Sequence, residues 1–369
     1  MKFLLHILIL LSLVLAACST ELTELSEEDW EYSDPQSNEL SPYPLIELDN
    51  ELKKGEFGPV KSLTIIKDQK LVFENYYQNS DPEELFPLER GTQAIFYLLF
   101  DEILNEAEIS FSDSVINLIS GYEQYFDNIP QKDRITIYDL MNNRSGIWWN
   151  EWDFQFRANP NDADEMKLQQ DWVDYVLSKR MIREPGQEFN YNSGHAILLS
   201  GILSQHLNGE LFETYKSRLF EPLGIKDYQW SLTPSGRLNN VSGLKLKARD
   251  MAKIGMLMAQ EGQWKNQGIY SERWSDILLF PPIVDNNYNY RMGWFKFGYF
   301  HPITRNNTTT ASDFVFMWSE GGQFIFVSPK YQMTVVFTGD FEHGQESDYI
   351  FYLFNKYIVP SITESSLGT

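Results

Sequence analysis

Segments with the character of β-strands stand at both ends of this 369-residue chain, and segments with helical character lie between them. Residues 62–66 and 71–73 flank a polar turn, a pattern that predicts two strands joined by a hairpin. Residues 324–327 and 333–337 form a second such pair around Pro329. This order predicts an antiparallel sheet made from the two chain ends, with a helical insertion between them.

The interval between the strand pairs contains several apolar stretches with helical periodicity. Residues 94–105 are largely apolar and contain no proline, which predicts a buried helix. Helical spacing also occurs over residues 171–177 and 195–207, and a last helix is expected over 348–357. We therefore expect an α+β fold, in which an antiparallel β-sheet flanked by helices carries a helical subdomain.

The composition permits a large core and disfavours some partners. Hydrophobic residues make up 43% of the chain and aromatic residues 15%, so global disorder is not expected. The net charge is −22, from 52 acidic and 30 basic side chains. Nucleic-acid binding depends on cations that neutralise phosphates, so this charge disfavours it. It equally disfavours unaided docking on an anionic membrane.

The first eighteen residues have the organisation of an export signal. Lys2 precedes an apolar run from residue 3 to residue 17, which is shorter than the ~20 residues that span a membrane. The run ends in Leu-Ala-Ala followed by Cys18, which resembles the bacterial lipobox, whose cysteine is lipidated. Cys18 is the only cysteine of the chain, so no internal disulfide is expected. An ordinary signal peptide is the alternative interpretation.

The composition changes abruptly after Cys18. Residues 19–34 contain seven carboxylates and no lysine or arginine, and three prolines follow by residue 44, a pattern typical of a solvated tether. The predicted organisation is a lipoprotein signal peptide at 1–18, an acidic flexible tether at 19–44, a folded domain at 45–360 and a tail at 361–369. Within the domain, the sheet is expected to use about 45–95 and 236–360, and the helical insertion about 96–235.

Five short segments carry a family resemblance in their order and spacing. They are residues 134–147 (RITIYDLMNNRSGI), 185–194 (PGQEFNYNSG), 219–225 (LFEPLGI), 243–255 (GLKLKARDMAKIG) and 321–325 (GGQFI). Together they resemble the serine β-lactamase and penicillin-binding-protein family, in particular the class C β-lactamase-related serine hydrolases. The resemblance covers about residues 60–355. It implies an antiparallel sheet flanked by helices, a helical subdomain, and an active site between the two.

The chemistry that this resemblance implies is altered at its centre. Family enzymes use a serine and a lysine three residues apart at a helix start. The corresponding segment here is residues 88–95 (LERGTQAI), which resembles that motif with Arg90 in place of the serine and Gln93 in place of the lysine. A guanidinium stays protonated and cannot attack a carbonyl, and an amide is no base. The resemblance therefore implies a catalytically impaired protein, a pseudoenzyme.

The other family positions are partly retained. Tyr191 matches the tyrosine of the second motif and is followed by Ser193, although a buried structural tyrosine is the simpler alternative. Ser319 and Glu320 stand where the family more often has histidine or lysine with glycine. A buried cation is costly unless it is paired, so we predict an ion pair between Arg90 and Glu320. The alternative is that both charges are solvated.

Other candidate centres are weaker. Ser242 and Lys245 form a Ser-x-x-Lys by chance, in a segment that the resemblance assigns to a glycine-rich loop. Ser193 and His195 are two residues apart and would not face one another on a helix. The five histidines form no HExxH or HxxxH pattern, so neither a metal nor another cofactor is predicted.

The leading hypothesis is a β-lactamase-related lipoprotein of the bacterial cell envelope, lipid-anchored through Cys18 outside the cytoplasm, at the outer membrane or cell surface. It would act by binding a cell-wall peptide, a glycan or a protein, or by a structural role. The alternative is an active serine hydrolase of β-lactam, ester or peptide bonds with a non-standard nucleophile. Family membership alone supports that alternative, because fold does not establish function.

Overall fold

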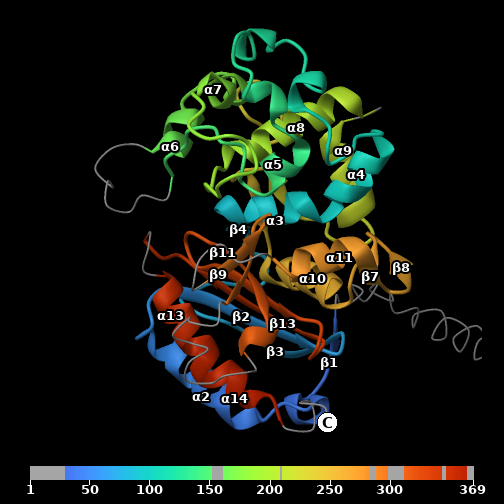
Figure 1. The fold of residues 1–369 in the computed structure, drawn as a ribbon. Coiled ribbons are helices and arrows are strands. Elements are labelled where there is room, and N and C mark those ends of the chain that lie inside the picture. Colours follow the sequence, from blue (N-terminus) through green and yellow to red (C-terminus); the bar gives the residue numbers. More distant parts are fainter. Residues whose placement is uncertain are drawn as a thin grey trace, which may run out of the picture. The chain divides into compact units, whose positions relative to one another are not determined.

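An eight-stranded sheet forms the scaffold of the molecule (Figure 1). The computed structural model describes residues 30–151, 161–207, 210–281, 288–297, 311–342 and 346–363. The chain separates into two units, residues 1–31 and residues 32–369, and the site lies within the second. The strands are β1 (Glu31–Tyr32), β2 (Val60–Lys67), β3 (Lys70–Tyr76), β9 (Tyr288–Arg291), β10 (Trp294–Phe297), β11 (Val315–Ser319), β12 (Gln323–Ser328) and β13 (Met333–Gly339).

The strand order brings the two ends of the chain together. It runs β1-β3-β2-β13-β12-β11-β10-β9, and every pair from β3 to β9 is antiparallel. In the centre, β13 pairs with β2, so that Val335 lies opposite Ile65. The predicted sheet built from both chain ends is therefore confirmed, as are the two predicted hairpins.

One face of the sheet is rich in phenylalanine and is covered by helices from the two ends of the described part of the chain. These are α2 (Pro42–Lys54) and α13 (Glu346–Leu353), which continues through η10 (Phe354–Ile358) into α14 (Val359–Ser361). The ring of Phe326 stacks on that of Phe354 with 4.0 Å between centroids. Stacked and edge-on aromatic pairs of this kind give the core a large buried area and a defined geometry.

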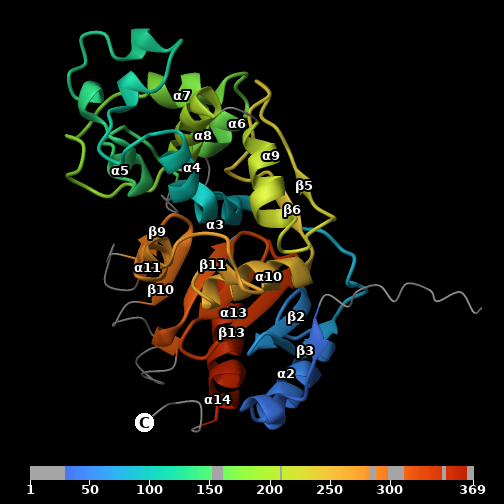
Figure 2. The same cartoon turned by 90° about the vertical axis from the view of Figure 1, so that its right-hand side faces the viewer.

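The opposite face carries smaller side chains and is covered by α10 (Ala248–Ala259), with α11 (Glu272–Leu279) nearby (Figure 2). Helix α10 lies close against the sheet at Gly255, where a Cβ would collide with Thr334 and Ile325. A glycine is needed there because any side chain would push the helix off the sheet. Covering both faces explains why every position of the central strands β12 and β13 is buried.

The helical part lies at the other end of the unit, above the sheet in Figures 1 and 2. Its helices are α3 (Thr92–Phe96), α4 (Phe100–Glu106), α5 (Ile137–Met141), α6 (Asp162–Lys167), α7 (Trp172–Ser178), α8 (Gly194–His206) and α9 (Leu211–Tyr215). Helix α8 packs against α5 and α7 and is buried continuously from Gly194 to Leu203. A helix without a polar face is stable only in such an enclosed position.

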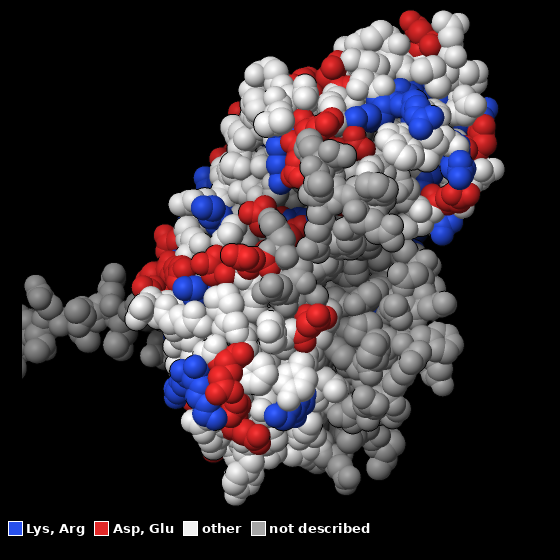
Figure 3. Space-filling model, turned by 90° about the vertical axis from the view of Figure 1, so that its left-hand side faces the viewer, with Lys and Arg blue, Asp and Glu red and all other residues white. Residues whose placement is uncertain are grey.

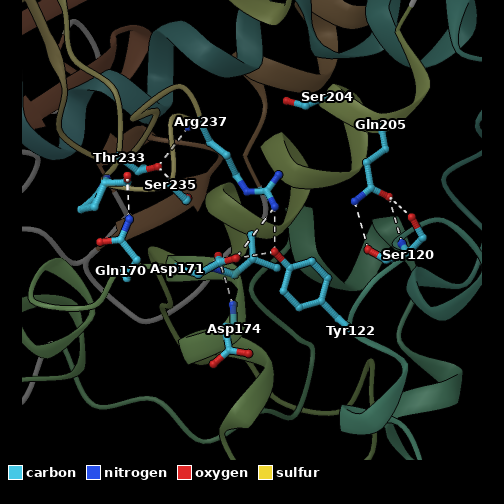
Figure 4. A network of polar contacts seen from close by, with 12 residues as sticks. Ser120, Tyr122, Gln170, Asp171, Asp174, Ser204, Gln205, Thr233, Ser235 and Arg237 are labelled. Carbon is cyan, nitrogen blue, oxygen red and sulfur yellow. Dashed lines mark hydrogen bonds and ion pairs between the residues drawn. The ribbon is translucent and has the colours of Figure 1, made fainter.

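Three loops of the helical part are joined by a polar network (Figure 4). The Tyr122 hydroxyl donates to Asp171 Oδ2 at 2.6 Å and accepts from Arg237 Nη2 at 2.7 Å. Asp171 also caps the first turn of α7 through the Val173 N–H. Burial, followed by the hydrogen bond to Asp171, raises the pKa of Tyr122 to about 12, so the hydroxyl keeps its proton and its donor role.

Two small sheets and a mixed surface complete the architecture. Strands β4 (Phe86–Pro87), β6 (Leu244–Leu246) and β5 (Gln229–Trp230) form one, and β7 (Gln263–Trp264) with β8 (Gln267–Gly268) forms the other. On the face drawn in Figure 3, the described lysines and arginines lie in separate small groups among carboxylates. Charges of both signs are therefore interspersed there.

Two sequence-based boundaries need correction. The predicted tether of residues 19–44 is wrong for residues 30–44, where Trp30 and Leu40 are buried and the turn η1 (Pro35–Asn38) is followed by α2. The prolines were misleading because they occupy helix starts, where a missing N–H costs nothing. The predicted tail also begins too early, because Ser361 and Ile362 are buried, and Ile362 pairs with Leu40.

The predicted helix over 94–105 is interrupted, since α3 and α4 are separated by the turn η3 (Tyr97–Leu99). The signal peptide at 1–18 with Cys18, the tether residues 19–29 and the tail residues 364–369 lie outside the described residues. Among the residues that are described, no helix is both long enough and apolar enough to cross a bilayer.

Candidate functional site

The candidate site begins at the short turn η2 (Glu89–Gly91), which leads from β4 into α3. This turn lies against strand β11, and a Cβ on Gly91 would come 2.5 Å from Met317 Sδ. Glycine at position 91 therefore allows the turn to rest on the sheet. The close approach places Arg90 beside the end of β11, next to the residues that follow it.

Arg90 forms an ion pair with Glu320, as the sequence predicted. The contact joins Arg90 Nη2 and Glu320 Oε1, and the two side chains are only 21% and 16% exposed. Glu320 lies in the turn between β11 and β12, where Gly321 and Gly322 have φ angles of 85° and 90°. Because both charges are largely removed from water, each depends on the other for compensation.

Two aromatic rings flank the guanidinium. Arg90 Cζ lies 5.7 Å from the ring centroid of Tyr191 and 5.8 Å from that of Trp318. Contacts at this distance attract a cation to the electron-rich ring face and are worth about 0.5–2 kcal/mol each. Arg90 is thus held between the second-motif tyrosine and the strand that carries the altered third motif.

Gln93 contacts the same tyrosine one helical turn later. Its Nε2 donates to the Tyr191 hydroxyl oxygen at 3.0 Å, and both side chains are buried. Burial is the main cause that raises the pKa of Tyr191 well above its usual range, with the charge of Glu151 as the next contribution. The hydroxyl is therefore neutral and unsuited to take a proton from another group.

The two candidate serines of the sequence analysis, Ser193 and Ser319, are buried. Ser319 is fully buried, and its hydroxyl donates to the Glu320 carbonyl at 3.1 Å. Ser193 is also fully buried; its N–H donates to Glu151 Oε2 at 3.0 Å, and its Oγ has no hydrogen-bond partner among the described residues. Neither serine is paired with a base in the described structure.

A second polar cluster, which the sequence reasoning missed, lies between α5 and α8. Ser145 Oγ is 2.7 Å from His195 Nε2, and His195 Nδ1 is 3.0 Å from Asn143 Oδ1. Asn143 Oδ1 also accepts the Asn192 N–H, which identifies it as an acceptor. His195 Nδ1 must then carry the proton, and Nε2 accepts the hydrogen bond from Ser145.

This cluster has the connectivity of a nucleophile, a base and an orienting group, but it is closed to solvent. The exposed fractions are 2% for Ser145, 2% for His195 and 5% for Asn143. Burial lowers the pKa of His195 to about 3, which keeps the imidazole neutral. No local signal could have revealed the cluster, because Ser145 and His195 are 50 residues apart and meet only in the fold. The predicted lack of pairing between Ser193 and His195 is confirmed, since His195 bonds to Ser145 instead.

The remaining candidates do not form a reaction centre. Lys245 is exposed on β6, and Ser242 is half-buried in the turn before it. No group of three metal-ligating side chains occurs within the described ranges. The Arg90 cluster, which we define as Arg90, Gln93, Tyr191 and Glu320, can donate hydrogen bonds and neutralise an anion. It lacks the serine hydroxyl and the lysine amine of the family motif, and its guanidinium cannot attack a carbonyl.

Comparisons with known proteins agree with this architecture. The Beta-lactamase family model matches residues 58–350. A D-aminopeptidase from Brucella anthropi is 23% identical over 177 residues, which is 46% of this chain and 32% of that protein. The chain thus spans about a third of the length of that curated relative.

Solved structures show the same fold at low sequence identity. A candidate 6-aminohexanoate-dimer hydrolase from Bacillus anthracis superposes with a TM-score of 0.67 at 15% identity, over 85% of this chain and 82% of the other. An octameric penicillin-binding protein homologue from Pyrococcus abyssi gives a TM-score of 0.62 at 16% identity, over 84% and 76%. The predicted α+β fold, a sheet flanked by helices with a helical subdomain, is therefore confirmed.

Proposed function

The chain belongs to the Beta-lactamase family, and from that premise we propose that it is a non-catalytic member that binds a ligand at the Arg90 cluster. One observation carries the proposal. Arg90 and Gln93, three residues apart at a helix start, stand where the family has its serine and lysine and contact Tyr191 and Glu320, and the Glu320 carboxylate is itself ion-paired with Arg90.

The contacts support the assignment of Arg90 and Gln93 to the positions of the family serine and lysine. Arg90 touches both the second-motif Tyr191 and the third-motif Glu320, and Gln93 donates to Tyr191. Replacing the family serine and lysine by an arginine and an amide removes the attacking oxygen and the proton acceptor together, so acyl transfer has no first step.

The class of ligand is proposed from the relatives. One matched protein is named a D-aminopeptidase, and one similar structure is named a candidate hydrolase of the 6-aminohexanoate dimer. Both names describe substrates that contain an amide bond. We propose that a cell-wall peptide is the favoured partner, with a glycan or a protein as the other partners that the sequence suggests.

We also propose that the protein is a cell-envelope lipoprotein anchored through Cys18. The support is the short apolar run that ends in Leu-Ala-Ala and the single cysteine of the chain. Acyl chains on Cys18 would bury their methylenes in the bilayer. A Cys18→Ser variant should shift the protein from the membrane fraction to the soluble fraction; retention on the membrane would contradict the lipid anchor.

A second candidate function rests on the Ser145 cluster, which we define as Ser145, His195 and Asn143. Its hydrogen bonds join a hydroxyl, an imidazole whose Nε2 accepts from that hydroxyl, and an orienting amide, as a serine hydrolase requires. Its burial argues against this function, because a substrate carbonyl must come within about 3.5 Å of the attacking oxygen. An experiment that detects a covalent intermediate separates the two candidates.

The test is the intact mass of the detergent-solubilised full chain after incubation with benzylpenicillin and, separately, with a fluorophosphonate. Three variants run beside the wild type: Arg90→Ser with Gln93→Lys, Ser145→Ala, and the combination of all three changes. We expect no adduct on the wild type. An adduct on the Arg90→Ser, Gln93→Lys variant that survives Ser145→Ala would support an oxyanion site preserved beside the Arg90 position.

A wild-type adduct that disappears in Ser145→Ala would overturn the proposal and identify Ser145 as the nucleophile. A wild-type adduct that persists in Ser145→Ala would equally overturn it, and peptide mapping would locate the reacting group. Ser145→Ala is a suitable control because Ser145 does not contact the Arg90 cluster through any described hydrogen bond or ion pair.

A further inference from the structure

We propose that the ligand of the Arg90 cluster carries a carboxylate, and that Glu320 is an internal occupant which this carboxylate displaces. The inference rests on the proposed binding function and specifies its chemistry. The folded chain leaves hydrogen-bond donors beside Arg90 without acceptors among the described residues, and Glu320 lies in a turn with two glycines.

Two buried donors near Glu320 have no acceptor among the described residues. One is Arg90 Nε, and the other is Trp318 Nε1, on the ring that lies 5.8 Å from Arg90 Cζ. Buried polar groups in folded proteins are nearly always hydrogen-bonded, so an unpaired donor needs an explanation. The two donors on neighbouring side chains would be satisfied by oxygen atoms of a bound molecule.

The guanidinium can accept such a molecule beside or in place of Glu320. It has five N–H donors in a planar fork, and a carboxylate can bridge two of them. The described ion pair uses Nη2, while Nε remains unpaired. A carboxylate across Nε and Nη2 would therefore complete the hydrogen bonding of Arg90, provided that Glu320 gives up its contact with Nη2.

Charge balance selects an anion over a neutral ligand. Arg90 is largely buried between two rings, so a ligand that removed Glu320 without supplying a charge would leave an uncompensated cation. Another nearby carboxylate, Glu151, is already bonded to Trp149 Nε1 at 2.7 Å and to the Ser193 N–H at 3.0 Å. Glu320, the ion-pair partner of Arg90, is therefore the carboxylate that a ligand would replace.

The turn that carries Glu320 allows this exchange without movement of the sheet. The backbone around it is fixed by hydrogen bonds from the Gly322 N–H to the Ser319 carbonyl and from the Phe341 N–H to the Gly321 carbonyl. The Glu320 side chain still reaches solvent, with 16% of its surface exposed. A rotation of this side chain outward would hydrate its carboxylate and free Arg90.

Aromatic side chains beside the cluster suggest a suitable probe. Trp318 and Phe189 are half-buried, and Phe189 packs edge-on against Tyr290, which in turn packs against Tyr191. Hippurate joins an aromatic ring, an amide and a carboxylate in one small molecule. Hippuramide has the same shape without the charge, so the pair isolates the contribution of the carboxylate.

The experiment follows the Nε–H signal of Arg90 by ¹⁵N NMR of the detergent-solubilised full chain, assigned by its loss in Arg90→Lys. Hippurate should shift this signal saturably, and hippuramide should not. In Glu320→Gln, the apparent Kd for hippurate should fall about tenfold or more, because the internal competitor has lost its charge. Glu320→Asp, with a shorter carboxylate, should lie between the two and serves if Glu320→Gln is poorly folded.

Arg237 supplies an internal control, because its Nε is also buried without a partner but belongs to the network in Figure 4. Its signal should not move with either probe. The inference is overturned if the Arg90 signal stays unchanged at saturating solubility in all variants, if hippuramide shifts it equally, or if Glu320→Gln binds hippurate no more tightly than the wild type. These failures are distinct from an acyl adduct on the wild type, which would overturn the proposed function itself.

Discussion

An acyl-transfer enzyme has its reactive groups at a site that substrate can reach, whereas here the two properties belong to two different clusters. The Arg90 cluster has the location, because Arg90 and Glu320 lie beside the second and third motifs and are 21% and 16% exposed. The Ser145 cluster keeps the chemical groups, with 2.7 Å between Ser145 Oγ and His195 Nε2, but only 2% of either residue is exposed.

The difference shows that hydrogen-bond geometry and access to substrate are separate requirements. The neutral imidazole of His195 is held by Ser145 on one side and Asn143 on the other. Asn143 also accepts the Asn192 N–H, directly after Tyr191. The Ser145 cluster therefore positions the segment that carries the second motif. We interpret the Ser145 cluster as a structural support for the Arg90 cluster.

The largest effect is expected from His195→Ala. The substitution leaves a cavity in the core and removes the partner of both Ser145 and Asn143, so the free energy of unfolding should fall by about 3 kcal/mol. Urea denaturation followed by tryptophan fluorescence measures this change. If the loss were below about 1 kcal/mol, the cluster would not be a support, and its burial would need another explanation.

A fall in pH should destabilise the protein through His195 as well, without the cavity that His195→Ala creates. The pKa of His195 is lowered from 6.5 to about 3 by burial. Between these two values, His195 binds a proton in the unfolded chain but stays neutral in the folded chain. The resulting stability is complete above pH 6.5 and is lost progressively as the pH falls toward 3. Between about pH 7 and about pH 5, His195 should account for a loss of about 2 kcal/mol.

A His195→Gln variant isolates this contribution, because it removes the titrating group and leaves the carboxylates of the chain unchanged. Its stability should depend less steeply on pH over this interval than that of the wild type. Equal slopes would mean that the imidazole is reached by water in the folded state, which would favour a catalytic role for Ser145.

Much of the fold could be predicted from the sequence because it depends on local patterns. The two hairpins, β2 with β3 and β12 with β13, follow from apolar runs around short polar turns. Helices α7 and α8 follow from helical spacing. The error at residues 30–44 came from composition, since acidic residues and prolines are as compatible with helix starts as with a tether.

The Arg90 pair should show a moderate effect and a measurable coupling. Arg90→Met leaves the Glu320 charge largely buried and unpaired, so we expect a loss of about 2 kcal/mol, less than for a fully buried pair because both side chains keep some exposure. Glu320→Gln in the same chain should restore about half of it. Strict additivity of the two single changes in a double-mutant cycle would show that the pair is not coupled.

The two clusters also differ in how far the sequence could predict them. The Arg90–Glu320 pair was predictable for two reasons. The motif register places both residues at the same site, and an isolated buried charge is costly, so a partner of opposite charge is expected. The Ser145 cluster was not, because its members come from segments whose approach depends on the packing of α5 against α8. Contacts of this kind are set by the tertiary structure, which no local pattern encodes.

The smallest effect tests the hydrogen bond that joins Gln93 to Tyr191. In Tyr191→Phe, the buried Gln93 Nε2 loses its acceptor, and the free energy of unfolding should fall by about 1 kcal/mol. A further Gln93→Leu should recover part of this loss, because replacing both partners by apolar groups leaves no unsatisfied donor. If Tyr191→Phe costs nothing, Gln93 has exchanged its partner for water. The Arg90 cluster would then be more open than the described packing implies, and the contrast with the enclosed Ser145 cluster would become sharper.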